Sequence, residues 1–313
     1  MIFILYVLVA AGVCFVSVKA SNYVDALDQK TQLSGAFLGG ILLSAVTSLP
    51  ELFTSITAAV FVGQPEMCLG NILGSDLFNL AALSFFILVF WRGFSHAKLS
   101  ASHRMVALLT FGCYLAVTAD LLYTKPQTLP ISLTSIVIIV LYAFSVRFLS
   151  ASDTESKPTE TVCPLSLKQI LFRLAFVSVC IVVLSVIITY ITDDITVILH
   201  LNQGVAGALF LGIATSLPEV ASTIALFRMK SYDIACGNII GSCIFNFIIL
   251  SVVDILYSGG SVYVFGDVQT TVLLLCGMAA LLLIWILMKW RNRITQLICS
   301  LGILACYAVF LFS

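Results

Sequence analysis

The stretch AVTSLPELFTSI (residues 45–56) places a proline and a glutamate inside a long apolar run. A second stretch, IATSLPEVASTI (residues 213–224), carries the same TSLPE core in the other half of the chain. The two glutamates, Glu51 and Glu219, therefore stand 168 positions apart in matching surroundings. A carboxylate in apolar surroundings is costly unless it is paired or solvated, so its repetition indicates a duplicated unit with a functional acid.

The composition predicts a protein whose main solvent is lipid. Of the 313 residues, 61% are hydrophobic and 10% are charged, whereas about a quarter of the residues in a soluble domain are charged. The apolar runs are about 20 residues long, which suits helices that cross a bilayer. They are continuous rather than alternating, and lipid admits only helices or closed barrels. We therefore predict an all-α integral membrane protein.

One polar segment divides the predicted spans into two groups. The stretch SASDTESKPTETVCPL (residues 150–165) is rich in Ser, Thr, Pro and charge, as expected of a linker. The predicted units are a first five-helix repeat (1–149), a linker (150–168) and a second five-helix repeat (169–313). The ten predicted spans are 2–18, 33–62, 68–90, 103–123, 129–149, 169–191, 203–227, 231–256, 269–289 and 294–312.

The positive charges predict the orientation of these spans. The loops after odd-numbered spans hold 14 of the 15 lysines and arginines, and only Lys125 falls on the opposite side. Because basic loops remain in the cytoplasm, the linker is predicted to be cytoplasmic and both termini extracytoplasmic. The expected location is the plasma membrane, which in a bacterium is the inner membrane. The formal net charge of zero gives no attraction to nucleic acid.

A second motif strengthens the case for duplication. GNILGSDLFN (residues 70–79) matches GNIIGSCIFN (residues 237–246) at seven of ten positions. Each half has an odd number of predicted spans, so the second half must enter the membrane in the opposite orientation. Inverted repeats with interrupted helices near the midplane are the architecture of secondary transporters. We therefore expect two inverted five-helix repeats around a shared site.

The TSLPE motif supplies oxygen atoms beside each glutamate. Thr47 and Ser48 precede Glu51 by four and three positions, so their hydroxyls share its helical face. Pro50 lacks an N–H and is expected to kink the helix, which frees a carbonyl oxygen nearby. The second half repeats this arrangement with Thr215, Ser216, Pro218 and Glu219.

The second motif predicts a polar stripe on a helix in each half, because its polar residues recur every four positions. Asp76 breaks the repeat, since its counterpart is Cys243, and it lies about 100° off the stripe. A peripheral role and direct ligation both remain open for this acid. The stripes comprise Asn71, Ser75 and Asn79 in the first half and Asn238, Ser242 and Asn246 in the second, with Gly70, Gly74, Gly237 and Gly241 allowing close helix approach.

The predicted layer offers hard oxygen ligands and a charge that balances one divalent cation. Ca²⁺ prefers six to eight oxygens. The three histidines are expected at loop or helix-end positions, and the ten cysteines form no CxxC pair, so zinc and copper are disfavoured. The same oxygens could hold several monovalent ions or accept protons. We expect transport without a cofactor or an obligate protein partner. A channel is the rival class of function. A membrane-embedded enzyme is disfavoured because no His or Cys joins the layer.

The paired motifs resemble the two alpha repeats of sodium/calcium exchangers, in the cation/calcium antiporter superfamily. The resemblance implies alternating access, with Ca²⁺ moving against Na⁺. Members with sodium coupling often carry an aspartate where Asn246 stands, so H⁺ or K⁺ coupling stays open. The short linker has no room for the calcium-sensing region of animal exchangers and suggests a compact, prokaryote-like member. The implied ligands are Glu51, Glu219, Thr47, Ser48, Thr215, Ser216, Ser75, Asn79, Ser242 and Asn246, with the main-chain carbonyls near Ser44 and Gly212.

Overall fold

The computed structural model describes residues 1–31, 44–122, 131–150, 165–263, 268–290 and 292–313. Within these ranges the ordered elements are helices, and no strand occurs. Eight helical segments are long and apolar enough to cross a bilayer. Two shorter apolar helices, Leu49–Phe61 and Leu133–Phe148, occupy the positions of the second and fifth predicted spans. The protein is therefore an all-helical, multi-pass membrane protein, and a total of ten crossings stays a prediction.

The first and sixth predicted spans are longer than the sequence pattern indicates. Helix α1 covers Ile2–Thr31 and α9 covers Leu167–Leu199, whereas their apolar cores were expected to end at residues 18 and 191. Hydropathy marks where apolar residues end, but helical hydrogen bonding continues beyond that point. Helix α9 begins with a capping box, because the side chain of Ser166 accepts from Gln169 N and the Gln169 side chain accepts from Ser166 N.

The second predicted span, 33–62, is described from residue 44 onward and is interrupted. Its pieces are α3 (Ser44–Thr47), α4 (Leu49–Ile56) and a π-helical turn, η2 (Thr57–Phe61). The seventh span consists of α10 (Gln203–Ala206), the π-helical turn η3 (Gly207–Leu211) and α11 (Gly212–Arg228). Interrupted helices of this kind occur in membranes where the backbone is buried in protein or lines a cavity.

Two long helices form the centre of the bundle. In α5 (Pro65–Val89) and α12 (Tyr232–Leu256), 72% of the residues in the most apolar stretch of the helix are buried. Helix α5 packs on α11, α13 (Val268–Lys289) and α14 (Arg293–Phe312) from the second half. Helix α12 packs on α4, α7 (Ala101–Leu122) and α8 (Leu133–Ser150) from the first. Each central helix thus lies against elements from the opposite half of the chain.

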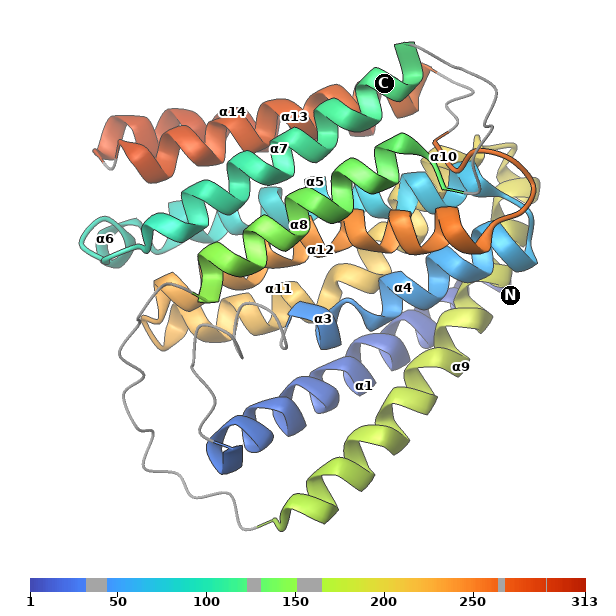
Figure 1. Cartoon of the computed structure of the whole chain (residues 1–313), viewed down its shortest axis with the longest axis horizontal. Coiled ribbons are helices and arrows are strands. Elements are labelled where there is room, and N and C mark those ends of the chain that lie inside the picture. Colours follow the sequence, from blue (N-terminus) through green and yellow to red (C-terminus); the bar gives the residue numbers. More distant parts are fainter. Residues whose placement is uncertain (32–43, 123–130, 151–164, 264–267, 291) are drawn as a thin grey trace.

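The remaining helices flank this centre. Helices α1 and α9 contact one another and lie on one side of the bundle, whereas α13 and α14 lie on the other (Figure 1). Helix α4 contacts α9, and α11 contacts α1, so the two TSLPE segments touch both the centre and this flanking pair. The short α6 (Trp91–Phe94) lies at the end of the bundle opposite the N-terminus (Figure 1).

Glycine allows α5 to lie backbone to backbone against the seventh-span segment. A Cβ added at Gly70 would collide with the carbonyl oxygen of Gly204, and one at Gly74 would collide with the backbone of Ala208. The predicted close approach at Gly70 and Gly74 is therefore confirmed. At Gly237 the neighbour is instead the imidazole ring of His103. The residues that correspond to Gly204–Ala208 in the first half lie outside the described residues.

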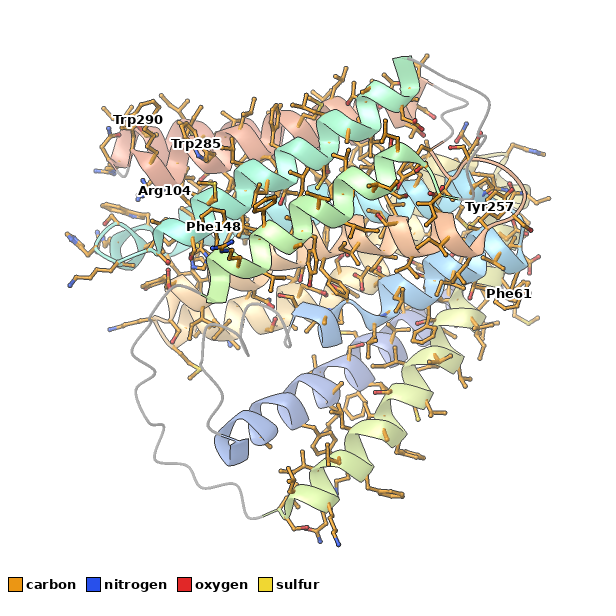
Figure 2. All side chains as sticks on the ribbon, viewed as in Figure 1. Phe61, Arg104, Phe148, Tyr257, Trp285 and Trp290 are labelled. Carbon is orange, nitrogen blue, oxygen red and sulfur yellow. The ribbon has the colours of Figure 1, made fainter. Side chains whose placement is uncertain are left out.

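Residues that follow odd-numbered and even-numbered spans lie at opposite ends of the bundle. Trp290 lies beyond α13, and Phe148 lies near the end of α8; both are at one end, with Arg104 (Figure 2). Phe61 lies near the end of the second predicted span and Tyr257 follows the eighth, and both are at the other end of the bundle (Figure 2). This alternation is what successive crossings of a bilayer produce.

Candidate ion-binding site

The two halves of the site are joined by a pair of crossed hydrogen bonds. Ser48 Oγ donates to Glu219 Oε1 at 3.2 Å, and Ser216 Oγ donates to Glu51 Oε1 at 3.2 Å. Each serine lies three residues before the glutamate of its own half, yet it binds the glutamate of the other half. All four side chains are fully buried. The two TSLPE motifs therefore meet and complete one another.

The second oxygen of each carboxylate is left without a hydrogen bond. Neither Glu51 Oε2 nor Glu219 Oε2 has a hydrogen-bond partner among the described residues. Thr215 lies near the Glu51 carboxylate and Thr47 near that of Glu219, but each threonine donates its hydroxyl hydrogen to a main-chain carbonyl of its own half, Leu211 and Ser44 respectively. The two carboxylates are close enough for their charges to interact. Buried polar atoms in proteins nearly always have a partner. Two such oxygens on facing acids are therefore suited to bind a cation.

Two asparagines hold the helical turn that follows each glutamate. Asn71 Nδ2 donates to Thr54 Oγ1 at 3.0 Å and to Ser55 Oγ at 2.9 Å. Asn238 Nδ2 donates to Ser222 Oγ at 3.0 Å and lies 3.4 Å from Thr223 Oγ1. Sequence reasoning placed both asparagines in the stripes but missed these four hydroxyls. A signal was present, since both halves carry a hydroxyl residue three and four positions after the glutamate, at 54/222 and 55/223.

The predicted main-chain ligands differ between the halves. Ser75 Oγ donates to the Gly212 carbonyl at 3.2 Å, which brings two of the candidate ligands together. The Ser44 carbonyl instead accepts from Thr47 Oγ1 at 3.1 Å and from Ser48 N at 3.0 Å, within its own segment. Ser242, the counterpart of Ser75, is buried, and its hydroxyl has no partner among the described residues.

The helices around the two prolines are ordered differently, and the kink expected at each proline stays a prediction. In the first half the helix is interrupted at Ser48, whose φ of −88° and ψ of 12° separate α3 from α4. In the second half Pro218 lies inside the continuous helix α11. A missing N–H is a local property, but whether the helix opens there depends on the packing around it.

Asp76 is hydrogen-bonded to one of the candidate ligands. Its Oδ1 accepts from Asn246 Nδ2 at 2.9 Å, and its Oδ2 accepts from Tyr114 OH at 3.4 Å. Asn79, the counterpart of Asn246, is buried, and neither its amide oxygen nor its amide nitrogen has a partner among the described residues. The structure therefore brings Asn246 to Asp76, and it shows no hydrogen bond from Asn79 or Ser242 to either glutamate.

The donor set of this layer consists of oxygen atoms. In the part of the chain that the structure describes, no three His, Cys, Asp or Glu side chains gather closely enough to form a metal cluster. A cation here would therefore depend on two carboxylates together with hydroxyl, amide and carbonyl oxygens. Such mixed oxygen sites suit hard cations, including Ca²⁺ and Na⁺.

Two further acids of α12 lie outside this layer, the buried Asp254 and the partly exposed Asp233. Asp254 lies in the last turn of α12, and its Oδ2 accepts from Ser132 N at 2.9 Å and from Ser135 Oγ at 2.8 Å. His103, a histidine expected at a loop or helix end, lies in the first turn of α7; it is buried, and its Nε2 lies 3.0 Å from Asp233 Oδ1. Both acids join α12 to the helices beside it, which sequence spacing does not reveal.

Comparison with known proteins agrees with this architecture. Over 236 residues the chain is 28% identical to the inner membrane protein YrbG of Escherichia coli (strain K12), an alignment that covers 72% of this chain and 70% of that protein. The fold is similar to that of the H⁺/Ca²⁺ exchanger CAX, with a TM-score of 0.71, 14% identity, and coverage of 99% of this chain and 87% of that one.

The sodium-calcium exchanger NCX_Mj also shares the fold, with a TM-score of 0.63, 20% identity, and coverage of 100% of this chain and 99% of that one. The family model for the sodium/calcium exchanger protein matches residues 1–151 and 170–313. That match covers almost the whole chain, including both TSLPE segments and both asparagine stripes. The chain therefore belongs to the sodium/calcium exchanger protein family.

Proposed function

We propose that the protein is a secondary active antiporter that exchanges Ca²⁺ for Na⁺ by alternating access. The crossed pair Ser48–Glu219 and Ser216–Glu51 is the observation that carries the proposal. It places two buried carboxylates from different halves in one layer, each with one oxygen that has no hydrogen-bond partner among the described residues. The two negative charges balance one Ca²⁺, and the same oxygens can hold monovalent cations. Because either cargo fills the site, the movements of the two are coupled.

The proposed ligands are those of the shared layer. Glu51 and Glu219 supply the charge, and their free Oε2 atoms bind the cation directly. Neutral oxygens complete the coordination, since Ca²⁺ prefers six to eight oxygens and two carboxylates supply at most four. These neutral ligands are Thr47, Ser48, Thr215, Ser216, Ser75, Asn79, Ser242 and Asn246, with the carbonyls of Ser44 and Gly212.

The proposed architecture is ten spans in two inverted repeats, 1–149 and 169–313, separated by the linker 150–168. Reciprocal packing supports it: α5 lies on α11, α13 and α14, and α12 lies on α4, α7 and α8. Each pairing in one set has its repeat counterpart in the other. The linker is proposed to be cytoplasmic and both termini extracytoplasmic, because the basic residues favour that orientation.

A calcium antiporter driven by H⁺, or linked to K⁺, is the alternative use of the same site. Asn246 and Asn79 favour it, because both stripes end in a neutral amide, which gives the layer less negative charge to hold several sodium ions. The resemblance of the fold to an exchanger described as H⁺/Ca²⁺ is compatible with it. Both alternatives need the same two glutamates.

Calcium flux in proteoliposomes, with Na⁺, K⁺ and H⁺ gradients imposed separately, tests the proposal. We expect Ca²⁺ uptake driven by an opposing Na⁺ gradient and little uptake when choline replaces Na⁺. Uptake driven by a pH gradient alone would select the proton-coupled alternative. Calcium flux that is independent of every counter-ion would contradict both forms of exchange and indicate a channel.

A further inference from the structure

The two halves of the site differ in charge at one buried position. Asp76 lies between Ser75 and Asn79 in the first half, and the matching position in the second half is Cys243. Both side chains are fully buried. A buried acid is expensive and is retained where it has a specific partner. The question is therefore what the carboxylate of Asp76 does that a thiol does not do in the other half.

The contacts of Asp76 determine how Asn246 is turned. Asp76 Oδ1 accepts from Asn246 Nδ2, and the nitrogen is the only end of an amide side chain that can donate a hydrogen bond. That hydrogen bond is 2.9 Å long and joins α5 to α12. Tyr114 on α7 holds the other carboxylate oxygen at 3.4 Å. The Oδ1 of Asn246 consequently faces away from Asp76, and this buried atom has no partner among the described residues.

Asn79 shows what happens without such a carboxylate. It occupies the matching repeat position, and it is also buried. Both ends of its amide lack a partner among the described residues, so no hydrogen bond selects one orientation of its side chain. The two amides at the ends of the stripes are thus chemically identical but differently constrained.

We propose that Asp76 is a positioning residue that turns the amide oxygen of Asn246 toward the transported cation. A cation needs the oxygen end of an amide, and a flip would present two N–H groups to it instead. Fixing the amide beforehand removes the cost of reorienting it when the cation binds. The inference rests on the proposed function, because it requires a cation in the layer of Glu51 and Glu219. It makes the otherwise matched site asymmetric, with one amide preset and one adjustable.

A structural role for Asp76 makes a different prediction. If its carboxylate only held α5, α12 and α7 together, its loss would lower stability and turnover whatever stands at position 246. If it acted only through its charge, its effect on cation affinity would also be independent of Asn246. Dependence on the Asn246 amide is therefore the property that identifies positioning.

A double-mutant cycle measures that dependence. Asp76→Cys introduces the residue that the second half has at this place, and Asn246→Ala removes the amide. In proteoliposomes we expect Asp76→Cys to raise the KM for Ca²⁺ by about tenfold, with kcat within about twofold, as for the loss of a hydrogen bond to a charged group. In the Asn246→Ala background the same change should alter KM by less than about twofold. In the matched Asn79→Ala background it should keep its full effect.

Each outcome decides the inference. An unchanged KM in Asp76→Cys, or an equal rise in the Asn246→Ala background, would overturn it. Should Asp76→Cys not accumulate in membranes, Tyr114→Phe serves as the second variant, because it loosens the carboxylate and leaves Asn246 in place. It should raise KM by a smaller factor that again disappears with Asn246→Ala. Calcium flux by the unsubstituted protein tests the proposed function separately, so failure of one can be told from failure of the other.

Discussion

Ser48 of the first half donates a hydrogen bond to Glu219 of the second half at 3.2 Å. Because Ser216 does the same for Glu51, neither TSLPE motif forms a complete site within its own half. The carboxylate comes from one half and its hydroxyl partner comes from the other. Any movement that separates the two halves at this layer must therefore break both contacts together.

Neutralising either glutamate should abolish exchange. Glu51→Gln or Glu219→Gln keeps the side-chain volume but removes half of the charge that balances Ca²⁺ in the layer. We expect uptake of ⁴⁵Ca²⁺ into vesicles to fall to the level of vesicles that lack the protein, whereas the amount of inserted protein stays unchanged. Glu66→Gln, at the start of α5, is the matched control and should retain transport. Normal uptake by either site variant would remove that residue from the ligand set.

The crossed serines should contribute equally. Ser48→Ala and Ser216→Ala each delete one hydrogen bond to a carboxylate at the same distance, 3.2 Å. A hydrogen bond to a charged group contributes about 1.5–3 kcal/mol, so each change should raise the KM for Ca²⁺ by about tenfold to a hundredfold. Ser84→Ala is the control, because Ser84 is buried on α5 and its hydroxyl has no partner among the described residues. Effects that differ strongly between the two serines would contradict the symmetric role.

The hydrogen bonds from Asn71 and Asn238 to the hydroxyls after each glutamate, here called the asparagine clamps, should contribute to the stability of the folded protein. Asn71→Ala leaves the hydroxyls of Thr54 and Ser55 without the amide that binds them. Interhelical hydrogen bonds in membranes contribute about 0.6 kcal/mol on average. We therefore expect a loss of about 1–2 kcal/mol, measured as a lower unfolding temperature of the purified protein in detergent. Asn238→Ala should act in the same direction, and an unchanged unfolding temperature in both variants would show that the clamps are not structural.

Close packing of α5 should make Gly74 intolerant of even one methyl group. A Cβ there would collide with the backbone of Ala208, which cannot move aside as a side chain can. Gly74→Ala should therefore reduce folded protein in membranes, although alanine is by itself the better helix former by about 0.5–1 kcal/mol. Gly12→Ala on α1 is the control, because its Cβ would meet the Leu184 side chain at an ordinary 3.5 Å. Size-exclusion chromatography measures the yield of folded protein for the two variants. Equal yields would contradict the packing argument.

Much of the candidate site could be predicted from the sequence because its motifs occur in both halves of the chain. Apolar runs of bilayer length indicated helices, and the duplicated TSLPE and GN-x-x-GS motifs singled out Glu51 and Glu219. Both are buried, and the hydroxyls three residues before them do point into the shared layer. The helices and the burial of these side chains could be predicted because hydropathy and helical spacing are local properties, which a single segment carries without its neighbours.

Only the tertiary structure decided the contacts between segments that are distant in the chain. Local spacing placed Ser48 beside Glu51, but packing brings it to Glu219. Asp76 could not be assigned from its own helix, because its role depends on Asn246, 170 positions away. The sequence by itself determined which polar groups enter the membrane. The fold determined which of them meet, because a hydrogen bond depends on the distance between two atoms that no single helix holds.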